Sequence, residues 1–128
     1  MSEKFDKGMK IRRKVLGDAH VDRAEANKTP FDETFQEYIT EAAWGGVWAR
    51  PHFSLRERSI VTLSLLAATG NFAEIAMHVR ATANTGATED DLVEAMLHVA
   101  VYAGVPKANH AIAIIKETLA EMASDAPK

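Results

Sequence analysis

Apolar residues in this chain recur at intervals of three and four positions, and no segment of strand length alternates between apolar and polar residues. Intervals of three and four place apolar side chains on one face of an α-helix, whereas alternation would place them on one face of a strand. The sequence therefore predicts an all-α fold of five or six helices.

Glycine and proline mark several of the expected helix boundaries. The segment Gly17-Asp-Ala-His20 predicts a turn. Thr29-Pro30 predicts a helix start, because threonine is a good N-cap and proline is tolerated at the first helical position. Gly45-Gly46 predicts the end of that helix.

Two capping-box patterns predict further helix starts in the second half of the chain. They are Ser54 followed by Glu57, and Thr88 followed by Asp91. The longest apolar run, Ile60–Ala68, predicts a central helix that is buried nearly all round. Residues 107–122 predict the last helix, with apolar side chains on one face.

The chain length bounds the domain organisation. With 128 residues, 47% of them hydrophobic and 26% charged, one compact globular domain is expected. Its helical core should span residues 29–122. Residues 1–28 are polar and locally basic, so they are expected to form an arm, with Arg12-Arg13-Lys14 as a solvated basic face.

Composition excludes several classes of function. The chain has no cysteine, which rules out disulfides, thiolate nucleophiles and iron–sulfur clusters. Its net charge of −3 provides no overall basic field for nucleic acid. Residues 60–68 are interrupted by hydroxyl residues and are too short to span a bilayer, and residues 1–7 contain no apolar signal core. A cytoplasmic protein without a membrane or nucleic-acid partner is expected.

Glu74 and His78 are four residues apart on a predicted helix, so their side chains should share one face. A carboxylate that accepts from one ring nitrogen orients the imidazole, raises its pKa and leaves the other nitrogen for proton transfer. Apolar neighbours such as Ile75 and Val79 should also perturb the pKa. Two local ligands are too few for a zinc site. An exposed ion pair without a catalytic role is the alternative interpretation.

Two further histidines stand in contrasting settings. His20 lies in the predicted turn, where an imidazole could be positioned for chemistry, although a loop histidine is more often only solvated. His110 lies among apolar residues of the last predicted helix, and a hydrogen-bonded core or interface histidine is its expected role.

The string Trp44-Gly-Gly-Val-Trp48-Ala-Arg50 is the most unusual in the chain. Two tryptophans could form a wall against a flat ligand, and Arg50 could bind a carboxylate with two hydrogen bonds. Both indoles could instead be core anchors. Arg58 is a second candidate anion ligand, with a surface ion pair to a neighbouring glutamate as the alternative.

Five strings together resemble the 4-carboxymuconolactone decarboxylase family. In chain order they are Arg12–Arg23, Trp44–Arg50, Arg58–Leu63, Glu74–Arg80 and Tyr102–Pro106, and the similarity runs from about residue 8 to about residue 120. The second half is also similar to the wider alkylhydroperoxidase D-like superfamily, whose all-helical unit is the fold that the resemblance implies. Peroxidases of that superfamily carry a Cys-x-x-Cys pair where this chain has Asn71 and Glu74, so thiol peroxidase activity is excluded.

The resemblance implies decarboxylation of 4-carboxymuconolactone to the enol-lactone of 3-oxoadipate, in the protocatechuate branch of the β-ketoadipate pathway. No cofactor is implied, because the ring double bond and the lactone carbonyl can accept the electrons released with carbon dioxide. The reaction needs hydrogen-bond donors to the lactone oxygen and a general acid for the adjacent carbon.

The resemblance also suggests a role for each candidate residue. His78 is the expected acid, Glu74 its orienting partner and His20 a second donor, although either histidine could deliver the proton. Arg50 or Arg58 would bind the acetate side chain of the substrate, which does not react. The leaving carboxylate would face an apolar wall formed by Trp44 and Trp48.

The partners implied are a small lactone dicarboxylate and further copies of the same chain, expected as a hexamer. The sequence leaves two alternatives. One is a related lactone decarboxylase or isomerase with another substrate. The other is a non-catalytic helical binding module of the same fold.

Overall fold

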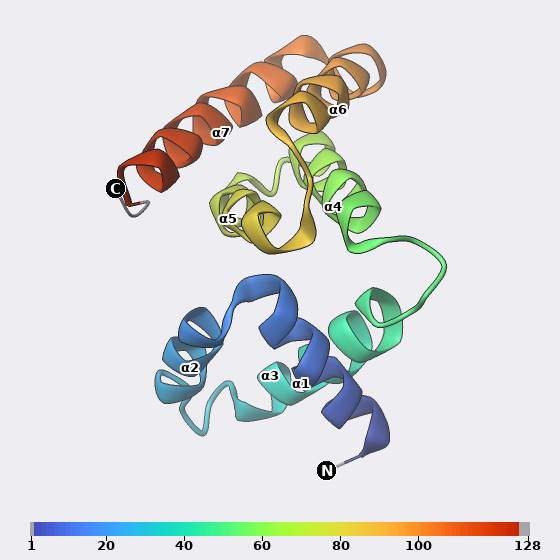
Figure 1. The fold of residues 1–128 in the computed structure, drawn as a ribbon, viewed down its shortest axis with the longest axis vertical. Coiled ribbons are helices and arrows are strands. Elements are labelled where there is room, and N and C mark those ends of the chain that lie inside the picture. Colours follow the sequence, from blue (N-terminus) through green and yellow to red (C-terminus); the bar gives the residue numbers. More distant parts are fainter. Residues whose placement is uncertain (1, 126–128) are drawn as a thin grey trace. The chain divides into compact units, whose positions relative to one another are not determined.

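The computed structural model describes residues 2–125, which contain helices and no strand (Figure 1). The helices are α1 (Glu3–Leu16), α2 (Asp18–Ala26), α3 (Glu33–Ile39), α4 (Leu55–Thr69), α5 (Ile75–Thr85), α6 (Glu89–Tyr102) and α7 (Val105–Asp125). A π-helical segment, η1 (Thr40–Trp48), continues α3, and a 3₁₀ turn, η2 (Phe72–Glu74), precedes α5. The all-α prediction is confirmed. The helix count exceeds five or six because residues 1–28, expected to be an arm, contain α1 and α2.

The chain divides into two compact units, one ending at Leu55 and the other beginning at Arg56. The assignment of a single domain stays a prediction. None of the helices within residues 2–125 combines the length and the apolar character needed to cross a membrane.

In the first unit, α1 packs against η1 at two glycines. A Cβ atom on Gly8 would collide with the carbonyl oxygen of Thr40 and lie 2.8 Å from the backbone nitrogen of Gly45. A Cβ on Gly45 would collide with the carbonyl oxygen of Lys4. The helix end predicted at Gly45-Gly46 is therefore wrong. The helix continues to Trp48, because glycine here permits the close approach of two backbones instead of breaking the chain.

Two other boundaries of the first unit differ from the prediction. Gly17, with φ +91°, separates α1 from α2, and His20 lies inside α2 instead of in a turn. Helix α3 begins at Glu33, three residues beyond Pro30. The backbone N–H of Thr29 donates to the Asp32 carboxylate at 2.8 Å. Residues 29–32 therefore form a non-helical turn ahead of α3 and do not belong to the helix.

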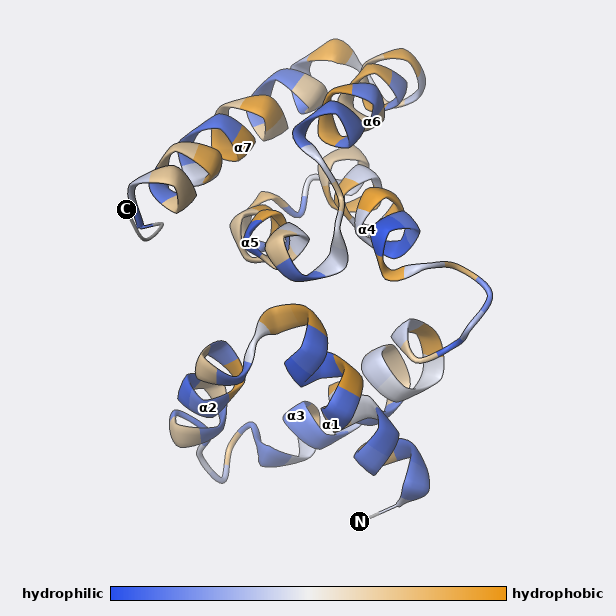
Figure 2. Ribbon diagram, viewed as in Figure 1, coloured by the Kyte–Doolittle hydropathy of each residue, from blue (hydrophilic) through white to orange (hydrophobic). Residues whose placement is uncertain are grey.

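The second unit follows its capping signals closely. Helix α4 begins directly after Ser54. In the predicted capping box of α6, the Asp91 N–H donates to the Thr88 hydroxyl at 3.1 Å, and the Thr88 N–H donates to the Asp91 carboxylate at 2.9 Å. Helix α7 alternates hydrophobic and hydrophilic patches along its length, as an amphipathic helix should (Figure 2). The apolar core draws on α4 to α7: Leu63, Ala67, Ile75, Val79, Leu92, Ala95, Met96, Val99, Ala108, Ala111 and Ile115.

Helix α4 is not buried all round, so that prediction is wrong for the single chain. Leu63 and Ala67 are fully buried, whereas Val61 is 44% and Leu65 57% exposed. Only one stripe of the helix packs into the core, because the other elements of the chain cover one of its faces. The uniformly apolar sequence does not distinguish the two faces.

Candidate active site

His78 lies on an inward-facing polar stripe of α5. It shares this stripe with Thr82 and Thr85, four and seven residues further on, and all three side chains are buried. The Nδ1 atom of His78 is shielded from solvent. Burial lowers the pKa of His78 to about 4, because the imidazolium would lose its hydration. The imidazole is therefore neutral at pH 7.

Glu74 lies outside the α-helix that carries His78, whereas the spacing predicted one shared helix. It is exposed and ends η2, directly before α5, where its side chain does not cap the helix. Burial lowers the pKa of His78, whereas the spacing predicted that a neighbouring carboxylate would raise it. The predicted rise of the pKa is therefore wrong. The i,i+4 rule assumes a continuous α-helix, and a 3₁₀ turn breaks that continuity.

Burial of His78 should make stability depend on pH. The unfolded chain takes up a proton at this histidine near its ordinary pKa of 6.5, the folded chain only near 4. Between these values the unfolded state binds more protons, so the free energy of unfolding should fall as pH falls from about 6.5 to about 4. Urea denaturation of wild type and His78→Asn would measure this. The stability difference between them should change by up to about 1.4 kcal/mol per pH unit. Parallel pH profiles of the two proteins would contradict the expectation.

Trp44 and Trp48 lie together on η1, with ring centroids 5.1 Å apart and an interplanar angle of 37°. Both indoles are buried, and their separation is typical of favourable aromatic pairs. The sequence predicted a helix break between the two tryptophans. That prediction is wrong, because η1 contains both of them. Arg50 follows in the loop after η1, as expected, and its side chain is exposed.

His20 is the third residue of α2, and its side chain is partly buried. Burial lowers the pKa of its imidazole, and the positive charges of Arg23 and Arg12 lower it further. Arg12 is itself buried, 6% exposed, with its Nη1 atom 3.3 Å from a carboxylate oxygen of Glu25. The basic face predicted around Arg12 is therefore not uniformly solvated. Arg12 shares the buried face of α1 with Gly8 and Val15, a spacing that could have revealed it.

Arg58 lies on the first turn of α4 and is 9% exposed. Its Nε atom is shielded from solvent. Burial excludes the surface location that the alternative interpretation, an exposed ion pair, required. Moving a guanidinium out of water costs free energy. The buried Arg58 is therefore a stronger candidate for a functional role than an exposed arginine would be.

The candidate residues are distributed over both units. The first unit contains His20, Trp44, Trp48 and Arg50, and the second contains Arg58, Glu74 and His78. In residues 2–125, no three histidine or acidic side chains group as metal ligands.

A pair of hydroxyl residues that the sequence did not predict lies beside the candidate residues. Ser59, next to Arg58, lies 2.7 Å from Thr85 between their side-chain oxygens, and the pair is buried. The position of Thr85 seven residues after His78, on the same helical face, is a signal that could have suggested it.

Comparison with known proteins gives the family of the chain. Residues 33–117 match the model of the carboxymuconolactone decarboxylase family. The chain is 39% identical to a 4-carboxymuconolactone decarboxylase of Acinetobacter baylyi, over 94% of this chain and 90% of that protein. It is 42% identical to the nitrosuccinic acid decarboxylase npaB of Metarhizium robertsii, over 92% of this chain and 82% of that protein. Together with the helical fold, these matches show that the chain belongs to the carboxymuconolactone decarboxylase family.

Proposed function

We propose that this protein decarboxylates 4-carboxymuconolactone to the enol-lactone of 3-oxoadipate. The observation that carries the proposal is the similarity over 94% of the chain to a decarboxylase named for that substrate. The matched region includes His78, a buried histidine on a polar face of α5. The reaction belongs to protocatechuate degradation.

The chemistry of this substrate needs no external electron acceptor. The bond between the ring carbon and the leaving carboxylate breaks, and its electron pair moves through the ring double bond to the lactone carbonyl. Carbon dioxide leaves, and one proton is added to the carbon beside the carbonyl. The protein has to stabilise the negative oxygen and supply the proton.

His78 is suited to perform these two tasks one after the other. Its neutral imidazole, favoured by burial, can donate an N–H hydrogen bond to the lactone oxygen. A bound dianion would favour the imidazolium and raise the pKa, so that a proton is available as the charge develops. His20 is proposed as a second donor, and Glu74 as an orienting group only once substrate is bound.

The other candidates are proposed to hold the substrate. Arg58 or Arg50 binds the acetate carboxylate, which does not react. The paired indoles of Trp44 and Trp48 form an apolar wall for the leaving carboxylate, since a tight salt bridge there would stabilise the ground state.

A second candidate reaction is the decarboxylation of nitrosuccinate, favoured by the 42% identity to a nitrosuccinic acid decarboxylase. The two substrates share one chemical plan. Each is a small dicarboxylate in which an adjoining group accepts the electron pair, the unsaturated lactone in one and the nitro group in the other. An arginine for the carboxylate that stays and a histidine for the developing anion would serve both.

A parallel assay of the purified protein on the two substrates tests the proposal. We expect release of carbon dioxide and enol-lactone from 4-carboxymuconolactone, at an unchanged rate after treatment with EDTA and with a carbonyl reagent. A much higher kcat/KM on nitrosuccinate would favour the second reaction. Turnover of neither substrate would overturn the proposal, and activity restored by a divalent metal would overturn its cofactor independence.

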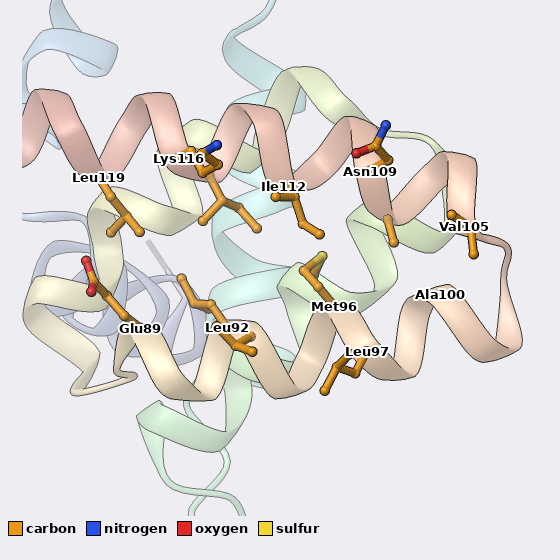
Figure 3. A pocket seen from close by; sticks show the side chains of 13 residues that line it. Glu89, Leu92, Met96, Leu97, Ala100, Val105, Asn109, Ile112, Lys116 and Leu119 are labelled. Atoms are coloured by element: carbon orange, nitrogen blue, oxygen red, sulfur yellow. The ribbon is translucent and has the colours of Figure 1, made fainter.

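Self-association is proposed on the groove between α6 and α7, about 410 Å³ in volume (Figure 3). Met96 and Ile112 point toward one another across it, and Leu97 at its edge is 56% exposed. Apolar surface of this kind is typical of faces that associate. Six copies, the number implied by the resemblance, and a cytoplasmic location remain proposals.

The substitution Leu97→Asp should break this association, because it places a charge on the apolar groove. Light scattering should give the mass of an oligomer for wild type and a smaller mass for the variant. Glu94→Gln changes the charge of α6 outside the groove and should leave the mass unchanged. A wild-type protein that is monomeric at micromolar concentration would contradict the expectation.

A further inference from the structure

Two side-chain links bracket Arg58 on the first turns of α4. On one side, Arg56 forms a two-pronged pair with Asp91 of α6, with Nε at 2.8 Å from Oδ2 and Nη2 at 2.6 Å from Oδ1. On the other side, Ser59 forms the buried 2.7 Å hydrogen bond with Thr85 of α5. The backbone that carries Arg58 is therefore held to two different helices within four residues.

The carboxylate that Arg56 contacts is itself held in place by a second hydrogen bond. Asp91 belongs to the capping box of α6, in which its carboxylate accepts from the backbone N–H of Thr88. The hydrogen bond from Arg56, followed by the one from Thr88, lowers the pKa of Asp91 to about 2. The carboxylate therefore stays charged over the whole working range of pH. A forked arginine on such a carboxylate fixes direction as well as distance.

The Ser59–Thr85 link differs from the bonds of other helical hydroxyls in residues 2–125. Five of these donate to a backbone carbonyl three or four residues earlier in the chain: Thr40, Ser64, Thr69, Thr82 and Thr118. Such bonds do not connect separate helices, whereas the Ser59–Thr85 hydrogen bond joins α4 to α5, the helix that carries His78. Replacing both members of a buried hydrogen-bonded pair by apolar groups of the same shape costs little stability. The link is therefore better explained by the orientation that it imposes on the two helices.

We propose that Arg56 and Ser59 are positioning residues for Arg58, acting through Asp91 and Thr85. They hold the first turns of α4 so that the buried guanidinium meets the non-reacting carboxylate of the substrate in one orientation. Two parallel hydrogen bonds to a carboxylate tolerate little rotation of the arginine, which is why its backbone has to be fixed. This inference rests on the proposed function, in which Arg58 binds that carboxylate.

Steady-state kinetics of Arg56→Gln and Ser59→Ala test the proposal. Because Arg58 binds a group that does not react, each variant should raise KM by about 5-fold and leave kcat within about 2-fold. A merely structural role would instead lower the active fraction, and with it kcat, at constant KM. Two matched controls should leave KM unchanged. Arg80→Gln removes another exposed arginine–carboxylate pair between helices, and Thr118→Val removes another buried helical hydroxyl.

A double-substitution cycle with Arg58 sharpens the test. If Arg56 acts through Arg58, then Arg56→Gln should raise KM no further in an Arg58→Gln background. Independent, multiplying effects on KM would overturn the proposal, as would an unchanged KM in both single variants.

Side-chain ¹⁵N relaxation of the Arg58 Nε–H group, without substrate, separates failure of this inference from failure of the proposed function. We expect an ordered group in wild type and in both controls, and a mobile one in Arg56→Gln and Ser59→Ala. If wild type turns over neither substrate, the proposed function fails, and the relaxation data still decide whether Arg58 is positioned. Equal order in all five proteins would overturn the inference.

Discussion

Replacing His78 by alanine is expected to lower kcat on 4-carboxymuconolactone by about 100- to 10,000-fold, the usual contribution of a positioned general acid. In the proposed mechanism, the variant loses both the N–H donor to the lactone oxygen and the source of the proton. KM should change far less, because the arginine proposed to bind the acetate carboxylate is untouched. Steady-state assay measures both constants, and far-ultraviolet circular dichroism checks that the helices are intact.

Two further variants separate catalysis from packing in this experiment. His98→Ala makes the same substitution at an exposed histidine of α6 and should leave kcat unchanged. Glu74→Gln should cause a much smaller loss than His78→Ala, because glutamine keeps a hydrogen-bonding group and removes only the charge. If His78→Ala folds and retains kcat within about 2-fold, His78 is a core histidine and the proposed mechanism is wrong.

The features that the sequence predicted correctly depend on neighbours along the chain. The capping box at Thr88–Asp91 needs only four consecutive residues, and its two hydrogen bonds form as expected. The apolar neighbours of His78 on α5 predicted a perturbed pKa; Ile75 and Val79 are fully buried, and burial does shift the pKa of His78. The all-α fold follows in the same way from the spacing of apolar residues.

The features that the sequence did not predict depend on distant contacts. Gly45 was interpreted as a chain break because the sequence near it does not reveal that Lys4 lies against it. Glu74 and His78 do not share one continuous α-helix, because a 3₁₀ turn replaces the expected start of that helix. Ser59 and Thr85 are 26 residues apart, and neither has an unusual local setting. The spacing of apolar residues does not constrain the roles of the remaining candidate residues. Those roles therefore have to be tested by measurements of activity.

The substitution Gly45→Ala is expected to destabilise the first unit by about 3 kcal/mol, the upper range for overpacking a well-packed contact. The added methyl group would collide with the carbonyl oxygen of Lys4, which is backbone and cannot rotate away. Helix α1 would have to move off η1. The two tryptophans of the chain, Trp44 and Trp48, both lie on η1, so fluorescence during urea denaturation reports on this segment.

Gly46→Ala is the matched control for this prediction. A Cβ atom on Gly46 would lie 3.4 Å from the carbonyl oxygen of Glu41 and 3.5 Å from the Cε atom of the flexible Lys4 side chain, which are ordinary contacts. Alanine is also favoured over glycine in a helix by about 1 kcal/mol. The two variants, made at adjacent residues, should therefore differ in stability, with a lower urea midpoint than wild type for Gly45→Ala and an equal or higher one for Gly46→Ala. Equal midpoints would show that the glycines do not serve close packing, and that the continuation of the helix to Trp48 has another cause.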